Sequence, residues 1–348
     1  MVEPEILCET RGRLGLAMLN RPQALNALNL SMVRALTQQL RAWAKDDAIK
    51  AVAIRGAGSR AFCAGGDIRV LHDLGRAGKK DEAVAFWREE YALDHLIKNY
   101  PKPYVALVEG VVMGGGVGLS IHGSHRVGAE KIVFAMPEVG IGFFPDVGAT
   151  YVLPRLRQHA GTWLALTGTR LGLADALALG LMTHHVPAAR FDHLIAALTD
   201  GEDVDRLLHR EAAAVGSGEV LGRLPAIERL FAGDSVENIL QALDGERGAD
   251  AAFARQAAAA IRANSPTSLK LAFEQLRRGA ESDFAECLRV EFRIASRILD
   301  NADYYEGVRA TVIDKNHAPR WNPDRLDDVD EDVVARYFAL LGAQELTL

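Results

Sequence analysis

The stretch from Glu109 to Gly148 constrains the fold most, because it joins a buried-type strand to a cluster of glycines. The apolar run Tyr104–Val108 leads into it, and Gly114–Gly116 follow, with Gly118 close behind. A strand that runs into glycines and then into a short helix exposes backbone N–H groups at the helix start, where the dipole favours negative charge. The sequence therefore predicts a turn that binds an anion or an oxyanion.

A second transition from apolar residues to glycine occurs at Phe62–Asp67, with the sequence FCAGGD. Two such turns can each direct one N–H at the same oxygen, as a developing thioester oxyanion requires. Loss of one such donor costs about 3–4 kcal/mol of transition-state stabilisation. A Walker A loop is excluded because no lysine followed by Ser or Thr comes after Gly114–Gly116, and Leu119 breaks the dinucleotide pattern G-x-G-x-x-G.

Two carboxylates, Glu138 and Asp146, lie in otherwise apolar, glycine-rich sequence. Apolar surroundings raise the pKa of a carboxyl group, which suits a general base or a nucleophile. A structural role is the alternative for both residues. Glu138 follows a proline and can make a turn or capping bond, and Asp146 lies in the β-turn composition Pro-Asp-Val-Gly.

The first half of the chain alternates between strand and helix patterns, which predicts an α/β fold. The predicted strands are Leu14–Leu19, Ala51–Ile54, Tyr104–Val108, Arg126–Gly128 and Lys131–Phe134. The predicted helices in this part begin near Ser31, capped by Asn29 or Ser31, and span Asp81–Asn99.

After Pro154 the strand patterns fade and helices dominate. We expect helices at Thr162–Thr167 and Leu173–Leu181, one from Ser265-Pro266 to Gly279, and one from Asp283 to about Asp300. The composition changes near residue 190. It predicts a core at 1–190 that holds the site and a helical C-terminal region at 191–348.

The composition fits a globular protein that does not act on nucleic acid or in a membrane. Of 348 residues, 49% are hydrophobic, and the net charge of −6 argues against a broad basic nucleic-acid surface. No apolar run is long enough to span a membrane, and no signal or transit peptide is visible. Three distant cysteines suit a reducing compartment, so we expect a cytoplasmic protein. Cys63 is expected to pack behind the glycine turn, and the histidines show no metal-binding spacing.

Several segments resemble the enoyl-CoA hydratase/isomerase (crotonase) superfamily, and more closely its 3-hydroxyisobutyryl-CoA hydrolase branch. The matching segments are Asn20-Arg21-Pro22 with Asn26-Ala27-Leu28, FCAGGDIR (62–69), REEY (88–91), KPYVALVEGVVMGGGVGLS (102–120), FAMPEVGIGFFPDVGATYVLPRL (134–156) and DYYEGVRATVIDKNHAPRWNP (303–323). The resemblance implies a spiral of ββα turns with a helical C-terminal region.

The resemblance also implies roles for individual residues. The N–H groups of Gly66 and Gly115 would form the oxyanion hole, and Glu138 and Asp146 would be catalytic. Glu90, Gly115, Glu138 and Asp146 would contact the acyl group. The backbone at Ala64, Gly66, Asp67 and Ile68 would meet CoA.

Two positions separate hydrolase from hydratase. Related hydratases carry a second catalytic glutamate as GGGxE, where this chain has Gly118, and they generally have glycine at the position of Asp146. The resemblance thus implies hydrolysis of a branched 3-hydroxyacyl-CoA, most simply 3-hydroxyisobutyryl-CoA in valine breakdown. An enoyl-CoA hydratase or isomerase is the first alternative, and a non-catalytic CoA-binding protein is the second. We expect no metal and no cofactor, because CoA is part of the substrate, and a homo-oligomer is open.

Overall fold

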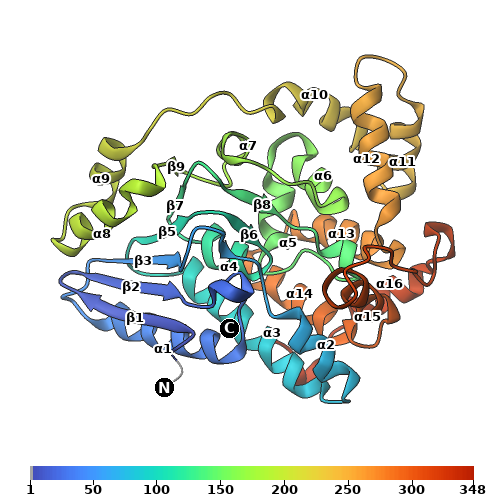
Figure 1. Ribbon diagram of the computed structural model, residues 1–348. Coiled ribbons are helices and arrows are strands. Elements are labelled where there is room, and N and C mark those ends of the chain that lie inside the picture. The colour runs from blue at the N-terminus through green and yellow to red at the C-terminus, as the bar shows by residue number, and fades with distance from the viewer. Residues whose placement is uncertain (1–2) are drawn as a thin grey trace. The chain divides into compact units, whose positions relative to one another are not determined.

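The computed structural model describes residues 3–348, which form two compact units (Figure 1). Each unit is assembled from three separate segments of the chain. Unit 1 comprises Met1–Asp67, Ala92–Phe134 and Arg170–Leu221. Unit 2 comprises Ile68–Tyr91, Ala135–Thr169 and Gly222–Leu348. The division at residue 190 inferred from composition stays a prediction.

Unit 1 is built on two sheets. The larger has the order β1-β2-β3-β5-β7-β9, in which β1 and β2 are antiparallel and the following neighbours are parallel. The smaller has the order β4-β6-β8. The strands are β1 (Ile6–Arg11), β2 (Leu14–Leu19), β3 (Ala51–Gly56), β4 (Ala61–Cys63), β5 (Tyr104–Val108), β6 (Val111–Met113), β7 (His125–Gly128), β8 (Val133–Ala135) and β9 (His184–His185).

The chain visits the two sheets alternately, which produces the predicted ββα spiral. β3 of the large sheet is followed by β4 of the small one, β5 by β6, and β7 by β8. A helix follows each of the first two pairs: α2 (Ile68–Arg76) after β4 and α4 (Gly115–Ile121) after β6. The predicted strands Arg126–Gly128 and Lys131–Phe134 correspond to β7 and β8, which belong to different sheets.

Helices cover both faces of the large sheet. Leu14 and Leu16 of β2 belong to a buried cluster with α8 (Phe191–Thr199) and α9 (Val204–Glu211). On the alternate positions, a Cβ atom at Gly15 would lie 2.5 Å from the Trp43 ring, so only glycine fits beneath that side chain. Trp43 belongs to α1 (Leu30–Lys45), which Figure 1 shows beside β1 and β2. Successive residues of β2 point to opposite faces of the sheet, so one set packs with α8 and α9 and the other faces α1.

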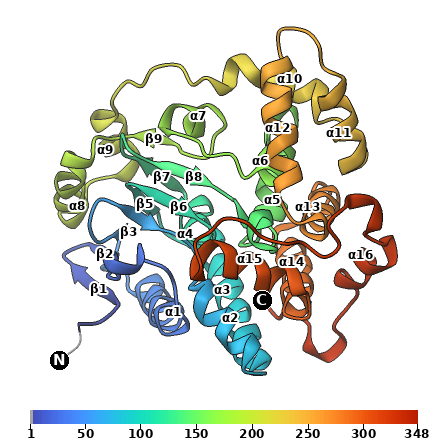
Figure 2. The same ribbon diagram turned by 45° about the vertical axis from the view of Figure 1, so that its right-hand side comes forward.

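The remaining helices lie between β8 and β9 and after α9. The one in unit 1 is α7 (Leu173–Ala178), which is shorter than predicted. Unit 2 has α5 (Ala149–Val152), α6 (Ala160–Thr167), α11 (Val236–Gly245), α12 (Ala251–Ala263), α13 (Pro266–Gly279), α14 (Phe284–Ile298), α15 (Ala302–Val308) and α16 (Glu331–Tyr337). Both views show α11 and α12 side by side (Figure 2). Two further helices, α3 (Lys80–Lys98) and α10 (Val220–Leu230), run from one unit into the other.

The cap residues explain why several helices begin where the sequence predicts. The side chain of Asn29 accepts a hydrogen bond from the Met32 N–H at the start of α1. Ser265 and Asp283 cap α13 and α14 in the same way. A capping side chain satisfies an N–H that has no partner inside the helix, which fixes the first turn.

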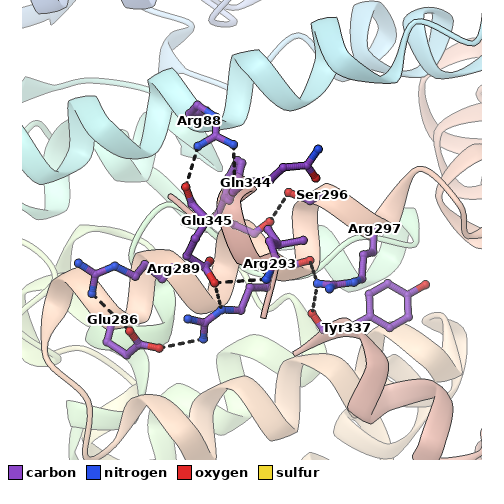
Figure 3. Close-up of polar contacts among 11 residues, drawn as sticks. Arg88, Glu286, Arg289, Arg293, Ser296, Arg297, Tyr337, Gln344 and Glu345 are labelled. Carbon is purple, nitrogen blue, oxygen red and sulfur yellow. Dashed lines mark hydrogen bonds and ion pairs between the residues drawn. The ribbon is translucent and has the colours of Figure 1, made fainter. Parts of the chain in front are cut away.

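The C-terminal residues are bound to α3 and α14 within unit 2 (Figure 3). Arg88 of α3 donates to the carbonyl oxygens of Gln344 and Glu345 at 2.7 and 3.1 Å. Arg293 of α14 donates to the Glu345 carboxylate at 3.0 Å and to Glu286 at 2.8 Å. These contacts fix the segment of α3 that carries Glu90.

No helix in the part of the chain that the structure describes is long and apolar enough to cross a membrane.

Candidate active site

The turn that contains Gly66 lies directly after β4 in unit 1. Leu28 pairs with Gly66 in a single parallel bridge, in which the Leu28 N–H donates to the Gly65 carbonyl at 2.8 Å and the Asp67 N–H to the Leu28 carbonyl at 2.7 Å. In such a bridge the central residue directs its own N–H to the opposite side. The Gly66 N–H therefore points away from Leu28.

Two polar residues brace this turn from the segment after β2. The buried Asn26 donates from Nδ2 to the carbonyl oxygens of Ala57 and Ala61, at 3.0 and 2.8 Å. Arg21 forms an ion pair with Asp67 at 3.0 Å and donates to the Ala27 carbonyl at 2.7 Å. The matching segments around residues 20–28 thus have a physical role in unit 1: they hold the second glycine turn.

Gly115 is the first residue of α4, which follows β6. Gly114 precedes it with φ +46° and ψ −126°, a conformation that favours glycine. The Gly114 carbonyl accepts from the N–H groups of Val117 and Gly118, at 2.7 and 3.3 Å. The N–H of the first helical residue has no acceptor within the helix, so the Gly115 N–H is available to a ligand.

The two glycine turns lie against each other in unit 1. A Cβ atom at Gly65 would be 3.6 Å from the Gly115 nitrogen, and one at Gly116 would be 2.3 Å from the Cys63 carbonyl oxygen. Glycine at 116 is therefore required by the close approach of α4 to β4. Cys63 is fully buried, and its Sγ accepts from the Gly65 N–H at 3.4 Å, as expected for a residue packed behind this turn.

Glu138 begins a 3-10 helix of unit 2, η2 (Glu138–Ile141), and is only 6% exposed. Its loop is fixed from the C-terminal half of the unit. The Ser265 N–H donates to the Val139 carbonyl at 3.2 Å, and the Ser265 hydroxyl donates to Asp303 at 2.6 Å. Gly142, with φ +69°, lies so close to Asp303 that a Cβ atom would be 2.1 Å from its carbonyl oxygen. The segment from residue 303 therefore supports the Glu138 loop.

Asp146 is buried and bonded to a tyrosine. The Tyr91 hydroxyl of α3 donates to Asp146 Oδ2 at 2.8 Å. Burial raises the pKa of Asp146 to about 7, although the Tyr91 bond works in the opposite direction. The main chain of Asp146 also forms a turn, because its carbonyl accepts from the Ala149 N–H at 3.0 Å. Asp146 therefore takes part in a turn through its main chain and also carries a buried carboxyl group with a raised pKa.

Glu90 precedes Tyr91 on α3 and is 3% exposed. Burial, together with the nearby charges of Asp146 and Glu291, raises the pKa of Glu90 well above its ordinary value. Within residues 3–348, its Oε1 atom has no hydrogen-bond partner. This oxygen is therefore available to a hydroxyl group of a ligand.

The structure brings the predicted residues together in two groups. In unit 1, the turns of Gly66 and Gly115 are adjacent. In unit 2, the charge of Asp146 acts on Glu90 and raises its pKa, while Glu138 lies eight residues before Asp146 in the chain. The predicted CoA contacts show other partners: the Ala64 N–H donates to the Leu25 carbonyl, Asp67 pairs with Arg21, and the Ile68 carbonyl accepts from Tyr304 at 3.4 Å.

Two residues beside Asp146 were not predicted as site residues. Tyr91 lies in the matching segment REEY and bonds to the Asp146 side chain, and Glu291 bonds to the backbone of Gly148 and Thr150. Glu291 lies on the apolar face of α14, between the buried Leu288 and Ala295. A carboxylate at an apolar position of a helix is a signal that is visible in the sequence.

The family model for enoyl-CoA hydratase/isomerase matches residues 14–338. The chain belongs to this family. A 3-hydroxyisobutyryl-CoA hydrolase, mitochondrial, from Danio rerio is 44% identical over 99% of this chain and 92% of its own length. The human protein of the same name is 39% identical over 98% and 90%.

Solved structures of the enoyl-CoA hydratase/isomerase family confirm the predicted fold. A crystal structure described as an enoyl-CoA hydratase from Rhodobacter sphaeroides has a TM-score of 0.92 and 39% identity, covering 99% of this chain and 100% of the other. One described as a carnitinyl-CoA dehydratase from Mycobacterium thermoresistibile has a TM-score of 0.93 and 38% identity, covering 99% of both. The crotonase-like assignment is therefore correct.

Proposed function

We propose that this protein hydrolyses the thioester of a short 3-hydroxyacyl-CoA, with 3-hydroxyisobutyryl-CoA as substrate. The observation that carries the proposal is Asp146. It is a buried carboxyl with a pKa raised to about 7 by burial, bonded to Tyr91, in a chain that has Gly118 where related hydratases carry their second glutamate. Relatives at 39–44% identity over nearly the whole chain bear the name of this hydrolase.

In the proposed reaction, the N–H groups of Gly66 and Gly115 donate to the thioester oxygen as negative charge develops on it. Preorganised backbone donors act on the transition state more strongly than on the ground state. Glu138 activates a water molecule or attacks the carbonyl carbon itself. In both routes the C–S bond breaks, CoA leaves as a thiolate, and water supplies the second carboxylate oxygen of the product.

Asp146 and Glu90 are assigned to substrate placement. Asp146 would hold the 3-hydroxyl group or the attacking water. Glu90, whose pKa is raised by burial, has an oxygen without a hydrogen-bond partner among residues 3–348 that can meet the acyl hydroxyl. No step requires a separate cofactor or metal, because CoA arrives as part of the substrate. The cytoplasm stays the proposed compartment on the sequence argument, while the named relatives are described as mitochondrial.

The test follows two products separately. The protein is incubated with 3-hydroxyisobutyryl-CoA and with crotonyl-CoA, while free thiol and the conjugated double bond are monitored. The proposal predicts thiol release from the hydroxyacyl thioester and no appreciable hydration of crotonyl-CoA. Loss of the double bond without thiol release would establish the hydratase alternative, and inertness toward a panel of acyl-CoA thioesters would favour a CoA-binding protein.

A further inference from the structure

Glu291 is a fully buried carboxylate in the middle of α14, and the proposed reaction assigns it no part. It lies on the apolar face of that helix, with an exposed fraction of 0%. Removing a carboxylate from water is costly unless hydrogen bonds replace those it loses. The partners of Glu291 therefore indicate why a carboxylate occupies an apolar position.

Both oxygens of Glu291 accept hydrogen bonds from the backbone directly after Asp146. Oε2 accepts from the Gly148 N–H at 2.8 Å, and Oε1 accepts from the Thr150 N–H at 2.9 Å. These two amides lie two and four residues beyond Asp146. One side chain therefore holds both ends of this short segment.

The segment is one that needs external support. Val147 has φ +54°, in the left-handed region that a β-branched residue strongly disfavours, and Gly148 follows with φ +87°. Strained backbone of this kind persists only where surrounding contacts hold it, and it concentrates at functional sites. The two bonds from Glu291 supply that support immediately beside Asp146.

The next residue of α14 contacts Tyr91, which donates a hydrogen bond to the side chain of Asp146. The Phe292 ring packs edge-on against the Tyr91 ring, with centroids 6.5 Å apart, and Tyr91 donates to the Asp146 carboxylate. Arg293 then bonds to Glu286 of the same helix and to Glu345 of the C-terminal segment, as Figure 3 shows. Consecutive residues of α14 thus contact the Asp146 turn, the donor to its side chain and the C-terminal segment.

We propose that Glu291 is a positioning residue, which holds the turn after Asp146 and thereby directs the Asp146 carboxylate toward the substrate. The inference rests on the proposed function, in which Asp146 contacts the acyl group or the attacking water. Glu291 itself touches no reacting atom.

A loss of kcat without a change in KM supplies a readout that a general structural role would not give. The titratable groups that interact electrostatically with Asp146 are Glu90 and Tyr91 from α3, Glu291 from α14 and Tyr304 from α15. Burial raises the pKa of Glu291 to about 8, and the charge of Asp146 adds to the rise. Burial raises the pKa of Asp146 only to about 7, so Asp146 ionises before Glu291, and replacing Glu291 by a neutral residue should leave the titration of Asp146 in place.

The experiment compares Glu291→Gln with Glu286→Gln, which makes the same change on the outer face of the same helix. Glutamine can accept only one of the two N–H bonds, because its amide group donates where the other oxygen accepted. We expect kcat for thiol release to fall about tenfold to a hundredfold, the size of effect that follows a displacement of about 1 Å. KM should stay within about twofold, and the acid limb of the pH profile should stay in place.

Amide hydrogen exchange tests the positioning role without turnover. Gly148 and Thr150 should exchange about tenfold faster or more in Glu291→Gln than in Glu286→Gln. If Glu291→Gln does not fold, Glu291→Asp, whose shorter side chain cannot reach both amides, takes its place. Unchanged exchange, or a kcat within about twofold of wild type, would overturn the inference. If wild-type protein releases no thiol while the exchange prediction holds, the proposed function is wrong and the positioning role stands.

Discussion

The candidate groups of unit 1 are backbone atoms, whereas those of unit 2 are side chains. The two glycine turns of unit 1 expose N–H groups, and a Cβ atom at Gly116 would overlap the Cys63 carbonyl. Unit 2 supplies buried carboxylates with raised pKa values, at Glu90 and Asp146. Backbone donors depend on close packing and on the absence of side chains, while carboxylates depend on burial and on their neighbours. Substitutions among the backbone donors and among the carboxylates should therefore reduce activity for different physical reasons.

The largest expected effect is on the side-chain half, in Glu138→Gln. General base or nucleophilic assistance is worth about 10²–10⁴ in rate, so kcat for thiol release should fall within that range. The fold should be retained, since the substitution preserves shape and removes a buried charge. Steady-state kinetics and a melting curve check this, with the exposed Glu228→Gln as control. A loss of kcat below tenfold would remove Glu138 from the reaction.

The matching test of the backbone half is Gly116→Ala. The new Cβ atom would lie 2.3 Å from the Cys63 carbonyl oxygen, so the two glycine turns must separate. Loss of one oxyanion donor costs about 10²–10³ in kcat, and we expect a loss of that order with a lowered melting temperature. The control is Gly172→Ala, where no atom lies within 4 Å of the added carbon. Equal activity of the two variants would show that the approach of the turns is irrelevant.

A smaller effect is expected from Tyr91→Phe, which removes the hydrogen bond to Asp146. A bond to a charged group contributes about 1.5–3 kcal/mol, which corresponds to a loss of about tenfold to a hundredfold in kcat. Because the Tyr91 bond lowers the pKa of Asp146, its loss should shift the acid limb of the pH–rate profile to higher pH. Tyr305→Phe, which loses a bond to the Leu299 carbonyl, should leave that limb in place. An acid limb that does not move would show that it does not report the ionisation of Asp146.

The smallest effect concerns stability rather than rate. The folded-state pKa of Asp146 is raised to about 7, so the native protein binds more protons than the unfolded chain between about pH 4 and 7. The stabilisation from this group is complete below its unfolded pKa and is lost as the pH rises through 7. One such group gives a slope of at most about 1.4 kcal/mol per pH unit. Asp146→Asn should flatten the pH dependence of the melting temperature between pH 5 and 8, and an unchanged slope would contradict this.

The same contrast explains what the sequence could predict. The ends of β2 and β5 were predicted correctly, because a short apolar run bounded by glycine or proline is compatible with few secondary structures other than a strand. β1 was missed because its second half, Glu9–Arg11, is exposed and polar at the edge of the sheet. The glycine turns were visible because their chemistry is local.

The surroundings of the carboxylates could not be predicted in the same way. Tyr91 is 55 residues from Asp146, and Glu291 is 143 residues from Gly148. Such contacts depend on how α3 and α14 pack in unit 2, and helical periodicity specifies only which face is buried. A polar residue on that face indicates that a buried partner exists, but the pattern does not name the partner.

The most direct test of the account is a crystal structure of Glu138→Gln with 3-hydroxyisobutyryl-CoA bound. The account predicts that the thioester oxygen lies about 2.7–3.1 Å from the backbone nitrogens of both Gly66 and Gly115. It also predicts that the acyl hydroxyl lies within hydrogen-bond distance of Asp146 or Glu90. A thioester oxygen bound by neither amide, or an acyl group distant from both carboxyls, would contradict it.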